Sequence, residues 1–270
     1  MPLVSNAFAS LCRIPGLRKL LWKRLYQFLA RMNTQQRWTF MNYGYEDLVQ
    51  PLAIPLEPGD EGDRYSIQLY HVVIGATPLV DKDVLEVGSG RGGGASYIQR
   101  YFKPGKTTGV DFSANAIAFC NRTHPVPQLA FRQGDAENLP FPDETFDVVL
   151  NIESSHCYGN LTAFLSEVRR VLRPGGFFLY TDFRSSDKVS LWIEQLRNSG
   201  LELVEQRDIT THVLAALDAD NQRKMRLIEE DIPKVLVKSF LDFAGMKGTP
   251  VYECFRKGEM QYLRFVLKKT

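Results

Sequence analysis

The sequence predicts an α/β fold: a seven-stranded, mainly parallel sheet with helices on both faces. The first observation is that short apolar strands alternate with helices from Asp83 to about residue 208, as in chains that build parallel sheets. The second is that Gly, Asp or Asn ends several of these strands. Because the carboxyl ends of parallel strands share one edge of the sheet, we expect a ligand site there.

Each element is read from its apolar pattern and its flanking residues. The expected strands are 84–87, 107–110, 129–131, 146–151, 177–180, 201–206 and 262–267. The expected helices between them are 113–121, 161–172 and 189–198. Ser113 is placed to cap the first of these helices, and Arg173–Gly176 to end the second.

The segments outside the sheet predict a helical cap. Residues 1–76 are expected to form an N-terminal cap or lid, since leucines recur at helical spacing between Leu17 and Leu29. Residues 77–208 form the expected core, 209–259 a second helical part broken at Pro233 and Gly245, and 260–270 the final strand. We expect both helical segments to lie over the strand ends.

Composition narrows the class of protein. The chain has 270 residues, of which 44% are hydrophobic and 24% charged, with a net charge of +2. These values suit a globular core and do not favour nucleic acid as a partner. The four cysteines include no close pair, so the chain is expected to be cytoplasmic with reduced thiols and no metal site. No apolar run reaches the ~18 residues of a membrane span.

A glycine-rich loop follows the first strand. Gly88, Gly90 and Gly93 satisfy G-x-G-x-x-G, a pattern that fits nicotinamide and S-adenosylmethionine enzymes alike. Glu86, two residues before Gly88, decides between them, because its carboxylate would repel a pyrophosphate. S-adenosylmethionine has no phosphate and carries a sulfonium and an ammonium. The predicted cofactor is therefore S-adenosylmethionine.

The later strand ends carry groups that fit the rest of this donor. Asp111 is expected to bind the ribose hydroxyls, with Phe112 beside it. Asp135 and the Ala136 amide are expected to read the adenine. Asn151 is expected near the methionine end, and either Tyr45 or Tyr43 is expected to close over the donor.

These motifs resemble those of class I S-adenosylmethionine-dependent methyltransferases. The resemblance rests on Val84–Gly94, Val110–Asp111, Gly134–Phe141 and Leu172–Gly176. Within this class the chain is most similar to the phthiotriol/phenolphthiotriol dimycocerosates methyltransferases, through Asn42–Glu46, Gly92–Tyr97 and Val149–Tyr158. The resemblance implies a Rossmann-like fold and O-methylation of a hydroxyl on a large apolar natural product, such as a polyketide lipid or a peptide.

The segment after the fourth strand holds the candidate catalytic groups. A hydroxyl needs a base that removes its proton as the new bond forms, and His156 is the candidate. Asp182, at the end of the fifth strand, is the expected partner that orients the imidazole. Glu153 leaves a different reaction open, since a carboxylate can stabilise the cation formed when an isoprenoid-like alkene is C-methylated.

Two further questions stay open at the level of sequence. The basic, leucine-rich N-terminal helix fits an anionic membrane surface, the sheet domain or a second subunit of a homodimer, and packing on protein is favoured. A catalytically inactive methyltransferase-fold binding module is the non-enzyme alternative. It is disfavoured because no glycine or strand-end acid is missing.

Overall fold

The computed structural model describes residues 38–75 and 77–270. The basic helix expected before residue 38 lies outside this part, so its contact with a membrane, the core or a second subunit stays a prediction. Among the helices of the described part, none is long and apolar enough to cross a membrane.

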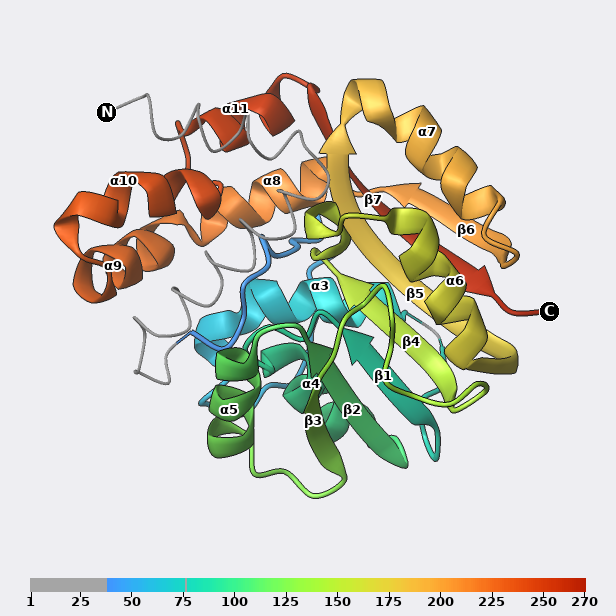
Figure 1. The fold of residues 1–270 in the computed structure, drawn as a ribbon. Coiled ribbons are helices and arrows are strands. Elements are labelled where there is room, and N and C mark those ends of the chain that lie inside the picture. The colour runs from blue at the N-terminus through green and yellow to red at the C-terminus, as the bar shows by residue number, and fades with distance from the viewer. Residues whose placement is uncertain (1–37, 76) are drawn as a thin grey trace.

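The sheet has seven strands in the order β3-β2-β1-β4-β5-β7-β6, and Figure 1 shows helices packed on both of its sides. β1 to β5 run parallel, and β7 lies antiparallel between β5 and β6. The bounds are β1 (Asp83–Val87), β2 (Lys106–Asp111), β3 (Leu129–Gln133), β4 (Phe146–Ile152), β5 (Leu172–Ser185), β6 (Glu202–Asp208) and β7 (Met260–Lys268). The predicted α/β fold and its mainly parallel sheet are confirmed.

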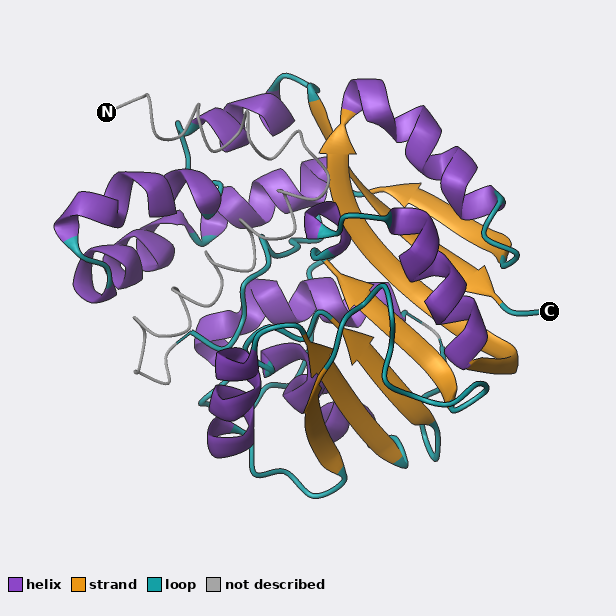
Figure 2. Cartoon of the chain, in the orientation of Figure 1, coloured by secondary structure: helices purple, strands orange, loops and turns teal. Residues whose placement is uncertain are grey.

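Helices occupy most of the connections between strands, as Figure 2 shows. The α-helices are α3 (Arg64–Ile74), α4 (Gly93–Tyr97), α5 (Ala114–Thr123), α6 (Leu161–Val171), α7 (Ser186–Arg197), α8 (Thr210–Ala219), α9 (Asn221–Asp231), α10 (Lys234–Phe243) and α11 (Pro250–Arg256). Short turns of other helix types are η1 (Glu61–Asp63), η2 (Ile98–Phe102) and η3 (Ser155–Cys157). The predicted cap of α5 is confirmed, because the Ser113 side chain accepts a hydrogen bond from the Ala116 amide.

Both faces of the sheet are buried, because successive residues of a central strand point into two different cores. In β4, Val148 belongs to the core that α3, α8 and α11 cover, whereas Val149 belongs to the core under α6 and α7. The carboxyl ends of the central strands are therefore held rigidly from both sides.

The structure differs from the sequence prediction at two elements. The helix α3 falls within the segment expected as a cap, yet Ile67, Leu69 and Val73 are fully buried in the core on one face of the sheet. The strand β5 begins at Leu172 and reaches Ser185, beyond the expected 177–180. Pairing with β7 from Phe177 to Ser185 supplies hydrogen bonds for the extra residues at the end of β5. At its beginning, a register shift between Phe146 and Val148 of β4 accommodates the Pro-Gly-Gly residues between Leu172 and Phe177.

The insertion expected at 209–259 consists of α8 to α11. Figure 1 shows these helices gathered at one side of the sheet, near the arrowheads of the parallel strands. Ile228, Ile232 and Met246 form a small core of their own, against which Trp38 and Phe240 pack. This arrangement places α9 and α10 opposite the strand ends.

Candidate active site

A largely apolar cavity lies between the carboxyl ends of the strands and the helices α9 and α10. Of the residues predicted for the donor site, those that line it are Gly88, Gly90, Asp111, Phe112, Asp135 and Ala136. The candidate catalytic residues His156 and Glu153 line the same cavity. Apolar clefts with a few convergent polar groups are the usual form of small-molecule sites.

The glycine loop bends in a way that requires glycine. Gly88 and Gly90 have φ of 76° and 53°, the left-handed region that side chains disfavour. A Cβ on Gly88 would lie 2.3 Å from Ser154 Oγ, whereas one on Gly90 would meet only Met41 Sδ at 3.9 Å. The first glycine is needed for packing within the protein, and the second leaves the loop open towards the cavity.

Asp111 joins this loop to the end of β2. Its carboxylate accepts hydrogen bonds from the amides of Gly90 (2.9 Å) and Ser113 (2.8 Å). Burial raises the pKa of Asp111 to about 6, although both amides act in the opposite direction. One amide on each oxygen leaves lone pairs for the two hydroxyls of a ribose. Asp135 lies on the same cavity wall and accepts a hydrogen bond from the Glu137 amide at 3.1 Å.

Glu86 lies beneath the loop and does not line the cavity. Its side chain is 1% exposed and accepts a hydrogen bond from the Tyr70 hydroxyl at 2.6 Å. Its second oxygen has no hydrogen-bond partner among the described residues. Burial raises the pKa of Glu86 to about 8, against the opposing effect of Tyr70 and the Ala95 amide. From this position Glu86 makes no direct contact with a ligand in the cavity.

Two other predicted donor residues also lie away from the cavity. Asn151 is fully buried, and its amide donates to the Val87 carbonyl at 2.9 Å and contacts the Ser154 and Tyr158 hydroxyls. It fastens the end of β4 to the end of β1. Tyr45 is fully buried as well, and its ring stacks on His212 with a centroid separation of 4.7 Å. Neither residue is brought to the donor cavity in the structure.

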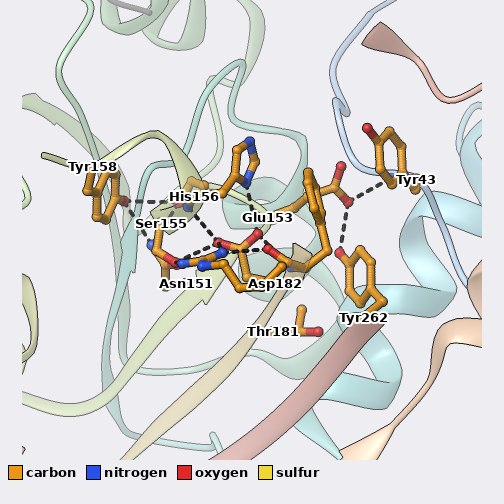
Figure 3. A network of polar contacts seen from close by, with 12 residues as sticks. Tyr43, Asn151, Glu153, Ser155, His156, Tyr158, Thr181, Asp182 and Tyr262 are labelled. Carbon is orange, nitrogen blue, oxygen red and sulfur yellow. Dashed lines mark hydrogen bonds and ion pairs between the residues drawn. The ribbon is translucent and has the colours of Figure 1, made fainter. Parts of the chain in front are cut away.

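His156 and Asp182 form the predicted pair. His156 stands in η3, and its Nδ1 lies 2.8 Å from Asp182 Oδ1, while its backbone amide donates to Oδ2 at 2.8 Å (Figure 3). Burial lowers the pKa of His156, but the neighbouring Cys157 and Asp182 outweigh it and raise the pKa to about 10. The ring packs on Phe183 with a centroid separation of 4.4 Å.

Asp182 is a fully buried carboxylate with many donors. Besides His156, it accepts hydrogen bonds from Ser155 Oγ at 2.6 Å and the Phe183 amide at 2.8 Å, and it pairs with Arg184 at 3.2 Å. Burial alone would raise the pKa of Asp182, yet His156 and Arg184 reverse this and lower it. Asp182 therefore stays ionised and fixes the proton of His156 on Nδ1. Ser155 and Arg184 are supporting residues that sequence reasoning missed, because only the fold brings them to Asp182.

Glu153 is the other candidate catalytic residue that lines the cavity. It has a φ of 50°, and its Oε2 accepts hydrogen bonds from the Tyr43 amide and the Tyr262 hydroxyl, both at 2.8 Å. Burial raises the pKa of Glu153 to about 7, although these hydrogen bonds and His156 lower it. Tyr43 and Tyr262 lie near opposite ends of the chain, so no local sequence pattern could have predicted their hydrogen bonds to Glu153.

Residues 38–43, which we call the strap, cross from the glycine loop to the cap. The Gly93 amide donates to the Thr39 carbonyl at 3.1 Å, and Lys224 of α9 donates to the Tyr43 carbonyl at 3.1 Å. Trp38 donates to Asp231 at 2.8 Å. Lys224 belongs to no sequence motif that could have predicted its contact with Tyr43.

No group of three or more His, Cys, Asp or Glu that could hold a metal occurs within residues 38–75 and 77–270. The polar groups at the donor end suit a nucleoside: a carboxylate with open lone pairs at Asp111, a bare loop at Gly90, and a second carboxylate at Asp135.

Comparison with known proteins gives the family. A model described as a methyltransferase domain matches residues 85–180. The phthiotriol/phenolphthiotriol dimycocerosates methyltransferase of Mycobacterium leprae (strain TN) is 40% identical over 253 residues, which cover 92% of this chain and 93% of that protein. A fatty-acid O-methyltransferase of Mycolicibacterium smegmatis is 40% identical over 247 residues, covering 92% of this chain and 89% of that protein.

Solved structures agree on the fold. A cyclopropane synthase from Mycobacterium tuberculosis has a TM-score of 0.69 at 15% identity, covering 89% of this chain and 95% of that one. The chain is an S-adenosylmethionine-dependent methyltransferase of class I, and it belongs to the family of phthiotriol/phenolphthiotriol dimycocerosates methyltransferases.

Proposed function

We propose that this enzyme O-methylates a hydroxyl of a large, largely apolar natural product, either a polyketide lipid or a peptide, with His156 as the general base. The observation that carries the proposal is the His156–Asp182 pair, in which His156 lines an apolar cavity that the glycine loop also lines and the buried Asp182 holds the imidazole. The relatives add that lipids are acceptors elsewhere in this family, as their names state.

Donor binding is assigned to Gly88, Gly90, Asp111 and the Asp135–Ala136 pair, all on one wall of the cavity. When bound, S-adenosylmethionine supplies a methyl group on a sulfonium, which is already reactive. The protein then has to align the acceptor oxygen and exclude water, and the apolar strap and α10 suit that task.

The His156–Asp182 pair favours an alcohol acceptor over a carboxylic acid. A carboxylate is a nucleophile without further deprotonation, whereas a hydroxyl must lose its proton during attack. With Asp182 holding the proton on Nδ1, Nε2 is the atom that accepts the hydroxyl proton. Because the pKa of His156 is raised to about 10, the basic form grows with pH, and kcat/KM should rise from pH 7 towards 10.

Glu153 keeps C-methylation as the second candidate, because its half-buried carboxylate lines the same cavity and could stabilise a cation there. The two reactions differ in the atom that receives the methyl group. We expect deuterated methyl from S-adenosylmethionine to appear on oxygen when a long-chain secondary alcohol is supplied, as located by mass-spectrometric fragmentation. A methyl on carbon of an isoprenoid alkene would overturn the proposal in favour of Glu153.

A further inference from the structure

We propose that Glu153 is a specificity-determining residue that accepts a hydrogen bond from a second hydroxyl of the acceptor, next to the hydroxyl that is methylated. The inference rests on the proposed O-methylation and names the acceptor class for the same site. Acceptors with two neighbouring hydroxyls are favoured, and carboxylic acids are excluded.

The carboxylate of Glu153 is fixed in direction. Its Oε2 is held by the Tyr43 amide and the Tyr262 hydroxyl, each at 2.8 Å, and its own amide donates to the Thr181 carbonyl at 2.9 Å. These partners come from the strap, β7 and β5, so both the side chain and its backbone are anchored to the sheet. A group held in this way can read a ligand without first losing conformational freedom.

The other oxygen of Glu153 is unused. Oε1 makes no hydrogen bond to any residue within 38–75 and 77–270, although Glu153 lines the cavity. Figure 3 shows this oxygen without a dashed line and pointing to the same side as the outer nitrogen of the His156 ring. Because Oε1 has unused lone pairs and opens on the cavity, a ligand that places a donor at that point can form a hydrogen bond with it.

The backbone at Glu153 supports a functional role. Its φ of 50° lies in the left-handed region, where glycine or asparagine would fit with less strain. Such strained residues concentrate at binding sites, because the surrounding structure keeps a costly conformation for the sake of a side chain. Here the conformation turns the Glu153 side chain towards the strap and the cavity.

The charges around Glu153 determine which ligand groups can donate a hydrogen bond to Oε1. The ionised Asp182 acts on Glu153 as a second negative charge, and Lys224 is engaged with Tyr43 and Asp220. If the methyl acceptor were a carboxylic acid, its carboxylate would lie beside Glu153 in a poorly solvated cavity, and the two negative charges would repel each other. A neutral hydroxyl donates its proton to Oε1 and meets no such repulsion.

The test uses three acceptors of one chain length: a secondary alcohol, its vicinal diol and the fatty acid. We expect the wild-type kcat/KM for the diol to exceed that for the mono-alcohol by roughly 100-fold, the effect of one additional hydrogen bond to a charged group. In Glu153→Gln, the amide oxygen can still accept from Tyr43 and Tyr262, while an NH₂ group faces the cavity. That NH₂ group can still donate to the second hydroxyl, but the bond is neutral and weaker than one to a carboxylate. The diol preference should therefore fall severalfold or more, and turnover of the fatty acid should rise.

Tyr262→Phe is the matched control, because it removes one partner of Oε2 and leaves Oε1 in place. It should keep most of the diol preference. Equal losses on diol and mono-alcohol in Glu153→Gln, at unchanged melting temperature, would overturn the inference, as would a wild-type enzyme without diol preference. Those results leave the proposed function standing as long as the label is found on oxygen. A label on carbon removes the proposed function itself.

Discussion

Two walls of the cavity, the one proposed to bind the donor and the one proposed to bind the acceptor, are built by different means, and we call them the donor wall and the acceptor wall. The donor wall is mainly backbone: Gly88 and Gly90 shape it, and main-chain amides hold Asp111. The acceptor wall carries His156, and behind it lies a network of side chains in which Asp182 contacts Ser155, His156 and Arg184. A site made of backbone groups depends on a few consecutive residues, whereas a network of side chains depends on residues that lie far apart in the chain.

The acceptor wall is expected to carry the largest functional effect. His156→Ala removes the proposed base, so turnover should fall roughly 10²- to 10⁴-fold. The rise of kcat/KM with pH should be lost as well. Stopped assays with labelled donor between pH 6 and 10 measure both quantities.

Affinity for S-adenosylhomocysteine is the control in that experiment. It should change little in His156→Ala, because the donor residues on the other wall are untouched. Full turnover with an unchanged pH profile would show that His156 is not the base. A matched loss of product affinity would show that the two walls are not separable.

This difference also explains what the sequence could predict. Gly88, Gly90, Asp111 and Asp135 follow strands with strong apolar patterns, and all four line the same cavity. The His156–Asp182 pair was predictable because both residues follow adjacent parallel strands, β4 and β5.

The remaining site residues depend on contacts that no local pattern records. Glu86 was expected beside the donor, but its position two residues before the loop puts its side chain below the loop, against Tyr70. Asn151 and Tyr45 have side chains that could bind a ligand, but both make contacts within the protein instead. Asn151 bonds to the Val87 carbonyl between β4 and β1, and Tyr45 stacks on His212. Lys224 reaches the strap only through the packing of α9.

The junction of the two walls should give the next largest effect. In Gly88→Ala, the new Cβ would lie 2.3 Å from Ser154 Oγ and 3.0 Å from Tyr158 Oη, in addition to a φ of 76°. Overpacking and backbone strain together should cost roughly 2–5 kcal/mol of unfolding free energy. Thermal unfolding followed by circular dichroism measures it.

Gly90→Ala is the matched control for that change. It has similar strain, with φ of 53°, but its Cβ meets only Met41 Sδ at 3.9 Å. It should lose less thermal stability than Gly88→Ala, and Ser154→Gly should partly rescue the latter. Equal melting temperatures for the two alanine variants would contradict the close packing of Ser154 under the loop.

The smallest expected effect concerns the buried carboxylate under the donor wall. The folded pKa of Glu86 is about 8, above its unfolded value of 4.5, so the folded state binds the extra proton. Its contribution to stability is complete below pH 4.5 and is lost as the pH rises through 8. Glu86→Gln keeps an oxygen for the Tyr70 hydroxyl and cannot ionise. It should therefore flatten the pH dependence of the melting temperature, with a gain on the order of 1–3 kcal/mol near pH 9.

That result would also sharpen the contrast with the acceptor wall. Asp182 has the opposite shift, and its contribution is lost only as the pH falls below its unfolded value of 3.8. Wild type and Glu86→Gln should consequently share the same acid limb and differ only on the alkaline limb of the stability curve. Parallel curves over the whole range would mean that Glu86 ionises normally beneath the loop. In that event the negative charge of Glu86 would act on the donor directly, in addition to the main-chain groups of the donor wall.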